Sequence, residues 1–411
     1  MRPYLAALVV CAVLWSGTRG ADLRNFDDAA LHAIQFVDEN EGWAVGDDGV
    51  VWHSIDSGQN WERQPTGVRA SFRSVHFINP YIGWIAGREE LPHGQGSVGV
   101  LLFSRDGGLK WQRVRTNTFP GLNRVRFVDV KTGFLAGDSS DQFPTGIFRT
   151  TDAGRTWKPI PGPRSTAWLA ADFQDAQTGA LAGAWCRLGV LRNGQFGNAD
   201  MDDILGGRAI RDLQVIGKRA VAVGQCGLVL TSSTSAGAQW GYANINLPTE
   251  VRACWDFHGV HCLGNHVWIV GRPGAAMLHS ANQAQTWEIV KTGQPLPLNG
   301  VYFAGERRGW AVGELGSILN TTDGGKSWRV QHRGGQRSAI LFVHARAIGL
   351  PVDAVAMVGA DDGYLAAGLR VVSSDPASAS PNRASEALRF AAAMRMAGGA
   401  AGEMLWQFPM A

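Results

Sequence analysis

Three observations in the sequence predict an all-β fold, a seven-bladed β-propeller followed by a small α/β C-terminal extension. A glycine-bounded phrase of the form G-W-x-x-G recurs about every 40 to 50 residues, which is the spacing of propeller blades. Short β-rich runs with glycine at the turns flank all seven copies. The chain also holds 53 glycines and 16 tryptophans, and only 18% of its residues are charged. This composition indicates many short strands around an extensive buried core.

The glycine-bounded phrase predicts the second strand of each blade. Its copies close at Gly46, Gly87, Gly137, Gly183, Gly224, Gly271 and Gly313. An inner strand such as Val125–Phe127 precedes it, and a third strand and a fourth strand that opens with tryptophan follow it. Because a lone blade cannot bury both of its faces, we expect ring closure to cover each face with a neighbour. We expect the ring to span residues 25–336.

The first 20 residues have the layout of a secretory signal peptide. Arg2 precedes an apolar run from Tyr4 to Trp15, and small or polar residues follow this run. The run is short for a membrane span, and no later stretch approaches about 18 uninterrupted apolar residues. We therefore expect an exported protein, periplasmic, thylakoid-lumenal or secreted, whose mature chain does not span a membrane. An uncleaved N-terminal anchor is the alternative.

Bulk charge gives no reason to expect a nucleic-acid partner. The chain has 38 Lys and Arg residues against 35 Asp and Glu residues, a formal net charge of +3. That excess is too small to attract a polyanion without a local basic patch.

A second repeated phrase, S/T-x-D-x-G-x-x-W, predicts the turn before the fourth strand. Its acidic residues are Asp56, Asp106, Asp152 and Asp323. Aspartate favours turns because its carboxylate accepts backbone N–H groups, and catalytic carboxylates come in unlike pairs and not in a repeating series. The phrases SANQAQTW (280–287) and STSAGAQW (233–240) keep the tryptophan but lose the acid. We therefore expect these aspartates to hold turns, and the tryptophans to fill the wedge between blades.

Inner-strand arginines are the predicted binding residues. Arg73, Arg211 and Arg252 occupy equivalent places in their phrases, and Arg124 lies one residue further along its own. Since inner strands line the channel of a propeller, these cations should approach one mouth and bind an acidic peptide or a carboxylate. The alternative is that each arginine pairs with a nearby aspartate or with solvent.

Four cysteines remain beyond the signal peptide. In an oxidising compartment, the repeat positions favour the disulfides Cys186–Cys226 and Cys254–Cys262. The stretch CWDFHGVHCLGNH (254–266) also offers three histidines, but its spacing does not match that of common zinc sites. We expect no metal and no cofactor.

The acidic phrase is the Asp-box, or BNR repeat, found in sialidases, some endoglucanases and sortilin-type receptors. Joined to GWAVG and preceded by LNGVYF (298–303), it resembles the photosystem II stability and assembly factor family of seven-bladed propellers. The resemblance covers about residues 30–333. It implies a non-enzymatic exported scaffold that binds a protein partner, such as a membrane-protein assembly intermediate. The fourth copy lacks an Asp-box, however, the cysteines cluster in copies four to six, and a C-terminal extension follows the ring.

The rival hypothesis is a hydrolase. A sialidase-like glycosidase would need an arginine triad, a tyrosine and glutamate pair and an R-I-P phrase, and no R-I-P phrase occurs. The extension, residues 337–411, faintly resembles the start of a PIG-L-type de-N-acetylase, with His344–Ala347 and Arg383–Glu386 at its motifs. Both metal-binding aspartates of that family would be missing. We expect a strand over 339–345, partial helix over 351–369, an alanine-rich helix that closes at Gly398 and a final strand. These elements form either an incomplete domain or a small α/β appendage on the ring.

Overall fold

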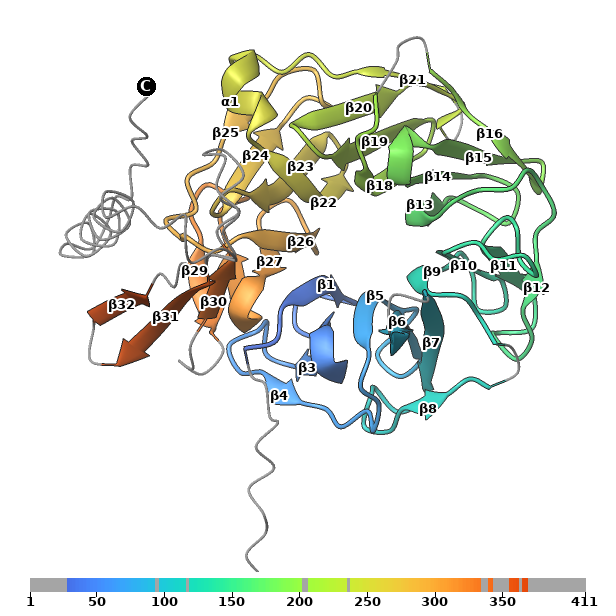
Figure 1. Cartoon of the computed structure of the whole chain (residues 1–411), viewed down its shortest axis with the longest axis horizontal. Helices are drawn as coiled ribbons and strands as arrows, with labels where there is room; N and C mark the ends of the chain where they lie inside the picture. The colour runs from blue at the N-terminus through green and yellow to red at the C-terminus, as the bar shows by residue number, and fades with distance from the viewer. Residues whose placement is uncertain are drawn as a thin grey trace, which may run out of the picture.

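The computed structural model describes residues 28–92, 96–115, 118–201, 206–234, 237–333, 339–342, 355–361 and 364–368. Seven sheets stand around a central channel, each with its first strand innermost (Figure 1). Six of these sheets have four strands and one has five, and consecutive strands pair antiparallel. We number the sheets blade 1 to blade 7 in chain order. The predicted seven-bladed ring is confirmed.

Each blade repeats the same four strands. The inner strands are β1 (Leu31–Phe36), β5 (Ser71–Phe77), β9 (Leu122–Phe127), β13 (Trp168–Phe173), β18 (Ile210–Ile216), β22 (Asp256–Leu263) and β26 (Leu298–Phe303). The second strands are β2 (Gly42–Gly46), β6 (Gly83–Glu90), β10 (Gly133–Gly137), β14 (Gly179–Gly183), β19 (Arg219–Gly224), β23 (His266–Arg272) and β27 (Gly309–Gly313). The third strands are β3 (Val51–Ser54), β7 (Ser97–Ser104), β11 (Ile147–Thr150), β15 (Leu188–Arg192), β20 (Leu228–Ser232), β24 (Ala276–Ser280) and β28 (Ile318–Thr321). The fourth strands are β4 (Glu62–Arg63), β8 (Gln112–Arg113), β12 (Lys158–Pro159), β16 (Gln195–Asn198), β21 (Gln239–Tyr242), β25 (Glu288–Ile289) and β29 (Arg329–His332).

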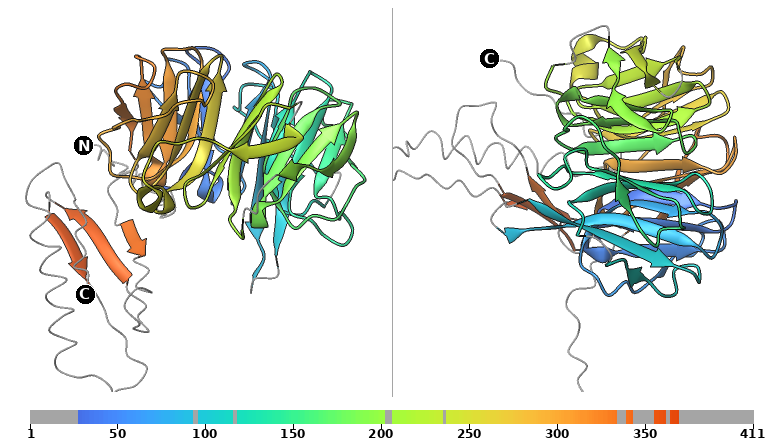
Figure 2. Two further views of the ribbon diagram at one scale, coloured as in Figure 1. Left: turned by 90° about the horizontal axis from the view of Figure 1, so that it is seen from above. Right: turned by 90° about the vertical axis from the view of Figure 1, so that its right-hand side faces the viewer.

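A few elements depart from the repeat. Strand β17 (Asp200–Met201) adds a fifth strand to blade 5 by pairing parallel with β21. A short helix, α1 (Thr249–Ala253), precedes blade 6, and 3-10 turns η1 (Asp47–Gly49), η3 (Ala184–Cys186) and η5 (Glu314–Gly316) follow second strands. The β6–β7 hairpin, with eight residues in each strand, extends beyond the disc of the ring (Figure 2).

Aromatic pairs hold most of the seams between blades. The second-strand ring of one blade stacks on the inner-strand phenylalanine of the next: Trp43 on Phe77, Trp84 on Phe127, Phe134 on Phe173, Trp268 on Phe303 and Trp310 on Phe36, at 3.5 to 4.0 Å between centroids. The tryptophan after the acidic turn meets the same phenylalanine edge-on, as Trp111 meets Phe77 at 85°. Stacked and edge-on contacts are the two favoured aromatic geometries, so each phenylalanine joins two blades.

The ring closes without exchange of strands. All four strands of blade 1 come from residues 31–63, and all four strands of blade 7 come from residues 298–332. The closing seam uses side chains: Trp310 Nε1 donates to Ser57 O at 3.1 Å, and Asn299 Nδ2 donates to Leu31 O at 3.0 Å. The described residues before Leu31 therefore add no strand to the last blade.

The Asp-box turn is stabilised by its own hydrogen bonds and also accepts a hydrogen bond from the preceding blade. Asp152 Oδ1 accepts the Thr150 hydroxyl at 2.8 Å and the Thr156 N–H at 2.9 Å. The carbonyl at the fourth position of the box receives an indole from the blade before it, since Trp43 Nε1 donates to Gly107 O at 3.0 Å. Blade 4, which has no Asp-box, instead joins β15 to β16 through Asn193 and Gly194, both at positive φ. An Asn-Gly pair is suited to such a tight hairpin.

Beyond the ring, β30 (Ala339–Phe342), β31 (Val355–Asp361) and β32 (Tyr364–Gly368) form an antiparallel sheet. β30 lies where a strand was expected, but the expected partial helix over 351–369 is wrong. The sequence Asp-Asp-Gly between two apolar runs is a hairpin signal, and it outweighs the helix propensity of the alanines. The signal peptide, His344–Ala347, Arg383–Glu386, the helix that closes at Gly398 and the final strand lie outside the described residues. Within the described residues, no helix has the length and apolar character to cross a membrane.

Candidate ligand site at the mouth of the channel

A β-bulge at one repeated position shapes the mouth of the channel. In each blade the pairing between the first two strands skips the residue after the start of the repeat, as between Phe72 and Ser74. The skipped residues are His32, Arg73, Asn123, Leu169, Arg211, His258 and Asn299. A bulge breaks the alternation of a strand and re-aims the side chain of its extra residue. All seven skipped residues line one cavity at the mouth.

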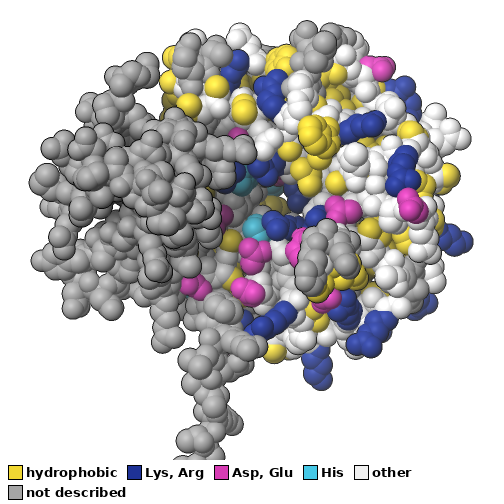
Figure 3. Space-filling model, viewed as in Figure 1, with side chains coloured by type: hydrophobic (Ala, Val, Ile, Leu, Met, Phe, Trp, Pro, Cys, Tyr) yellow, Lys and Arg dark blue, Asp and Glu magenta, His cyan; other side chains and the backbone are white. Residues whose placement is uncertain are grey.

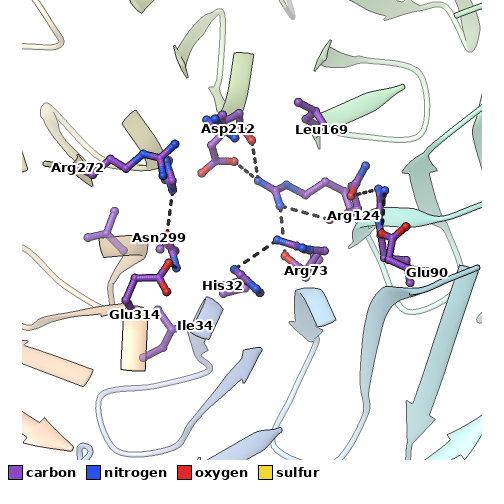
Figure 4. Close-up of a pocket in the computed structure, with 18 residues that line it drawn as sticks. His32, Ile34, Arg73, Glu90, Arg124, Leu169, Asp212, Arg272, Asn299 and Glu314 are labelled. Atoms are coloured by element: carbon purple, nitrogen blue, oxygen red, sulfur yellow. Dashed lines mark hydrogen bonds and ion pairs between the residues drawn. The ribbon is translucent and has the colours of Figure 1, made fainter. Parts of the chain in front are cut away.

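The cavity has a volume of about 550 Å³ and a strongly polar lining. Charged side chains and histidines gather around the hollow at the centre of the ring (Figure 3). The cations are Arg73, Arg88, Arg124, Arg211 and Arg272, and the anions are Glu90, Asp212 and Glu314. Several of these side chains point toward one another across the mouth (Figure 4). Blades 2, 3, 5 and 6 supply the arginines, so only ring closure brings them together.

Arg73 is the partly buried cation without an acidic partner. Within the described residues, no carboxylate oxygen lies within 4.0 Å of its guanidinium, and Nη1 donates to His32 Nδ1 at 3.5 Å. Burial lowers the pKa of Arg73, the carboxylates of Asp47 and Glu90 oppose this shift, and the neighbouring Arg88 and Arg124 add to it. Asp47 lies behind this pair: burial opposes its ionisation, but hydrogen bonds from His32 and Ser71 prevail and lower its pKa to about 2. Arg73 therefore has N–H donors beyond its contact with His32.

The other arginines of the mouth are anchored by aspartates. Arg124 Nη2 contacts Asp212 Oδ1 at 2.5 Å, and Arg88 Nη1 contacts Asp138 Oδ2 at 3.2 Å. Arg272 and Arg211 share Asp256, at 3.2 and 3.9 Å. Arg124 also donates to the carbonyls of Arg73, Asn123 and Arg211, and Arg88 to both Asp138 oxygens and to Asn123 Oδ1. Arg211 and Arg272 have fewer such contacts, so more of their five N–H donors remain for a ligand.

His258 adds a neutral imidazole to the rim. Burial, together with the positive charge of Arg211, lowers its pKa to about 4. Its Nδ1 lies 2.9 Å from Asn299 Oδ1, while Asn299 Nδ2 donates to Glu314 Oε1 at 3.2 Å. At neutral pH the rim is thus a network of amide, imidazole, guanidinium and carboxylate groups in which the guanidinium groups outnumber the carboxylates. Such a network suits an anionic ligand with several acceptor oxygens.

Comparison with known proteins identifies the relatives of this ring. The family described as "Photosynthesis system II assembly factor YCF48" matches residues 21–161. The predicted resemblance to the photosystem II assembly factor family is therefore confirmed. A curated relative, the chloroplastic photosystem II stability/assembly factor HCF136 of Oryza sativa subsp. japonica, is 28% identical over 102 residues. That match covers 24% of this chain and 24% of the relative, so it spans about a quarter of the relative's length.

Solved structures share the fold at low sequence identity. YCF48 bound to D1 peptide has a TM-score of 0.54 at 19% identity, over 72% of this chain and 92% of that chain. YCF48 from Cyanidioschyzon merolae has a TM-score of 0.55 at 18% identity, over 72% and 96% of the two chains. The GH74 enzyme of Niastella koreensis has a TM-score of 0.59 at 12% identity, over 83% and 58%. An enzyme and two assembly factors thus share this fold, which does not settle function.

The structure places three of the four predicted arginines at the mouth. Arg73 and Arg211 are bulge residues, and Arg124 follows the bulge residue Asn123. The prediction for Arg252 is wrong. This residue lies in α1, which precedes the inner strand β22, and the equivalent bulge residue of blade 6 is His258.

Arg88 and Arg272 were missed by the sequence analysis. Both follow the closing glycine of a second strand, Gly87 or Gly271, and this shared repeat position was the available signal. The residues at that position differ from blade to blade, so the signal was weak.

The predicted disulfides are absent. Cys226 and Cys262 are free thiols. Cys254 precedes β22 and Cys262 lies near its end, and six residues of strand span about 20 Å, far beyond the reach of a disulfide. Cys186 Sγ donates to Arg208 O at 2.7 Å, whereas the N–H of Cys226 donates to Asp256 Oδ1 at 2.9 Å. These two cysteines therefore meet different neighbours, one blade apart.

In the part of the chain that the structure describes, no group of three or more His, Cys, Asp or Glu side chains is arranged so that it could hold a metal ion.

Proposed function

We propose that this protein is a non-catalytic, exported binding protein that takes an acidic segment of a partner polypeptide at the mouth of its channel. The observation that carries the proposal is the convergence of five arginines from four blades on one cavity. Arginine is suited to this task because its planar fork binds carboxylates through two parallel hydrogen bonds. We propose Arg73, Arg124 and Arg211 as binding residues from the sequence, with Arg88 and Arg272 added by the structure.

Arg73 is the proposed anchor of the ligand. It is partly buried and already ordered by its contact with His32, so little side-chain entropy is lost when a carboxylate binds. The remaining arginines keep their aspartates and contribute second hydrogen bonds. A segment with more than one acidic residue, or with an acidic residue beside a free carboxylate terminus, matches this distribution of donors.

The relatives support the choice of partner. A solved YCF48 structure contains a D1 peptide, and the matching family is named for photosystem II assembly. By analogy, the partner here is a membrane-protein assembly intermediate whose exposed segment enters the mouth. A chloroplastic relative and the predicted signal peptide support action outside the compartment of synthesis.

The chemistry of the Asp-boxes supports a role without catalysis. Asp56, Asp106, Asp152 and Asp323 each accept hydrogen bonds within their own turn, and each has a lowered pKa. A general acid needs a raised pKa and a nucleophile needs a partner acid nearby. We therefore propose that these four residues hold turns.

Binding of an acidic D1 peptide, measured by fluorescence anisotropy, tests the proposal. Arg73→Ala and Arg211→Ala should each weaken binding about 10-fold or more, because each removes a charge-assisted hydrogen bond. Arg252→Ala is the matched control, since this arginine lies in α1 outside the mouth. Circular dichroism and thermal melting establish that every variant is folded. Unchanged affinity in Arg73→Ala, or an equal loss in Arg252→Ala, would refute the proposed site.

A further inference from the structure

A second cavity lies at the seam between blades 5 and 6, beside the acidic-turn positions. Its volume is about 480 Å³, and its lining includes Arg219, Thr231 and Gly241 of blade 5 with Gln283 and Ala284 of blade 6. The turns at this position hydrogen-bond to the turns at the far ends of the inner strands, as Ser57 N does to Asn40 O. The cavity is therefore at the opposite end of the blades from the arginine mouth, and it belongs to a different site.

Comparison with the other blades shows what this cavity lacks. On the face of a blade that meets the next blade, three side chains stand in a row across the second, third and fourth strands. In blade 1 the row is Trp43–His53–Glu62, and in blade 6 it is Trp268–His279–Glu288. The imidazoles stack on the indoles, at 4.8 and 5.3 Å between centroids. In blade 5 the same row is Val221–Thr231–Gly241.

The turn of blade 6 that faces this row also differs from the turns of the other blades, because it has alanine where they have glycine. A Cβ on Gly154 would lie 2.9 Å from Trp84 Nε1, and a Cβ on Gly325 would lie 3.0 Å from Trp268 Nε1, so the indole requires glycine there. The equivalent residue of blade 6 is Ala284, which packs in one buried cluster with Val221. The alanine methyl replaces only part of the missing ring. A Cβ on Gly241 would meet nothing within 4 Å, so the outer part of the row is open space.

The seam between blades 4 and 5 shows that small residues need not leave a cavity. Its row is Ala180–Val190–Gly197, equally small. Trp240 and Met201, however, pack into one core cluster with Ala180 and fill the inner part of that seam. In the seam between blades 5 and 6, Trp287 packs against the cluster that contains Val221. The cavity lies beside the outer part of the row, at Thr231 and Gly241.

The chemistry of the missing group follows from the seams that have it. In three of them the indole N–H donates to the carbonyl at the fourth position of the acidic turn, Gly107, Gly324 or Ser57, at 3.0 to 3.1 Å. Gln283 occupies that position in blade 6 and lines the cavity. Arg219 adds a cation at the rim, which is attracted to the face of an aromatic ring. We infer that this cavity binds an aromatic ring with an N–H group, of indole size, that a partner molecule supplies in place of the missing internal tryptophan.

Titration with N-acetyl-L-tryptophanamide, followed by NMR chemical shifts, tests the inference. The unmodified protein should bind one equivalent saturably, with shifts at Thr231, Gly241 and Gln283. Gly241→Leu should weaken binding at least 10-fold, because the leucine occupies the cavity. Gly197→Leu in blade 4 is the matched control and should bind normally, since Gly197 also has nothing within 4 Å of an added Cβ. Arg73→Ala should bind normally as well, which separates this site from the mouth.

Two results would overturn the inference: no saturable binding by the unmodified protein, or equal binding by Gly241→Leu. A ligand in which a methyl group replaces the indole N–H hydrogen provides a second measurement that does not depend on any variant. Its affinity should be lower than that of N-acetyl-L-tryptophanamide, and equal affinity would contradict the proposed hydrogen bond to the turn.

Discussion

At the scale of the residue, the acidic turn depends on an acceptor atom more than on a charge. In blade 6, Asn282 Oδ1 accepts the Ser280 hydroxyl at 3.0 Å and the Thr286 N–H at 2.9 Å, as Asp152 does in blade 3. In blade 5, Thr234 Oγ1 accepts the Gln239 N–H at 3.0 Å. The turn therefore keeps the same hydrogen bonds with either Asp or Asn as the acceptor. In blade 5 the corresponding hydrogen bond spans five residues and not four.

Substitutions of Asp152 should distinguish the acceptor from the charge. Asp152→Asn should change the free energy of unfolding at neutral pH by less than about 0.5 kcal/mol, because asparagine forms the same turn in blade 6. Asp152→Ala should cost about 1 to 2 kcal/mol, since the three hydrogen bonds to the Asp152 carboxylate are lost. Chemical denaturation of both variants makes the measurement, and equal losses would contradict this account.

The same aspartate predicts a sign for the dependence on pH. Hydrogen bonds from the side chain and backbone of Thr156 lower the pKa of Asp152 from 3.8 to about 2. A lowered pKa means that the ionised group stabilises the fold above pH 4, and that this stabilisation is lost as the pH falls through 2. Asp152→Asn should therefore show a shallower loss of stability over this acid range than the unmodified protein.

At the scale of the element, the seam between two blades depends on a glycine and a tryptophan from different blades. Gly154 of the blade 3 turn lies against the indole of Trp84 in blade 2, and it has a φ of +79°. This position therefore excludes a side chain for two reasons, the backbone conformation and the contact. Ala284, at the equivalent position of blade 6, also has a positive φ, +67°, so a methyl group is tolerated there where no indole faces the turn.

Two glycine substitutions should separate these reasons. Gly67 also has a positive φ, +67°, but nothing lies within 4 Å of its added Cβ. Gly67→Ala should cost only the conformational term, about 1 kcal/mol. Gly154→Ala should cost about 1 kcal/mol or more beyond this, because the methyl group displaces the indole. Thermal unfolding of the two variants compares them, and similar melting temperatures would contradict the contact.

The elements of the fold were predictable from the sequence wherever one phrase repeats. The second strands, the acidic turns and the aromatic seams could be predicted from the sequence repeat, because every blade packs against its neighbours through the same repeat positions. Arg252 was misplaced because α1 is inserted before β22 and displaces the phrase from the strand. A short helix without an amphipathic pattern leaves no periodic signal that would reveal the shift.

At the scale of the whole molecule, the two candidate sites exist only because the ring closes. The mouth joins arginines from four blades, and the seam cavity joins side chains from two. Arg73 and Arg211 could be predicted because a bulge recurs at their position, but Arg88 and Arg272 depend on distances across the ring. The predicted cysteine pairs were wrong for the same reason, since the spacing of residues along the chain does not give their distance across blades.

The central claim is that the arginine end of the channel is the binding face, and hydrogen exchange tests it most directly. Amide exchange is measured by mass spectrometry with and without a saturating acidic D1 peptide. Protection should increase in turns η1 and η5, which flank the mouth, and should not change in the acidic turns at residues 56–60 and 152–156. Protection confined to those acidic turns, with none at the mouth, would contradict the account.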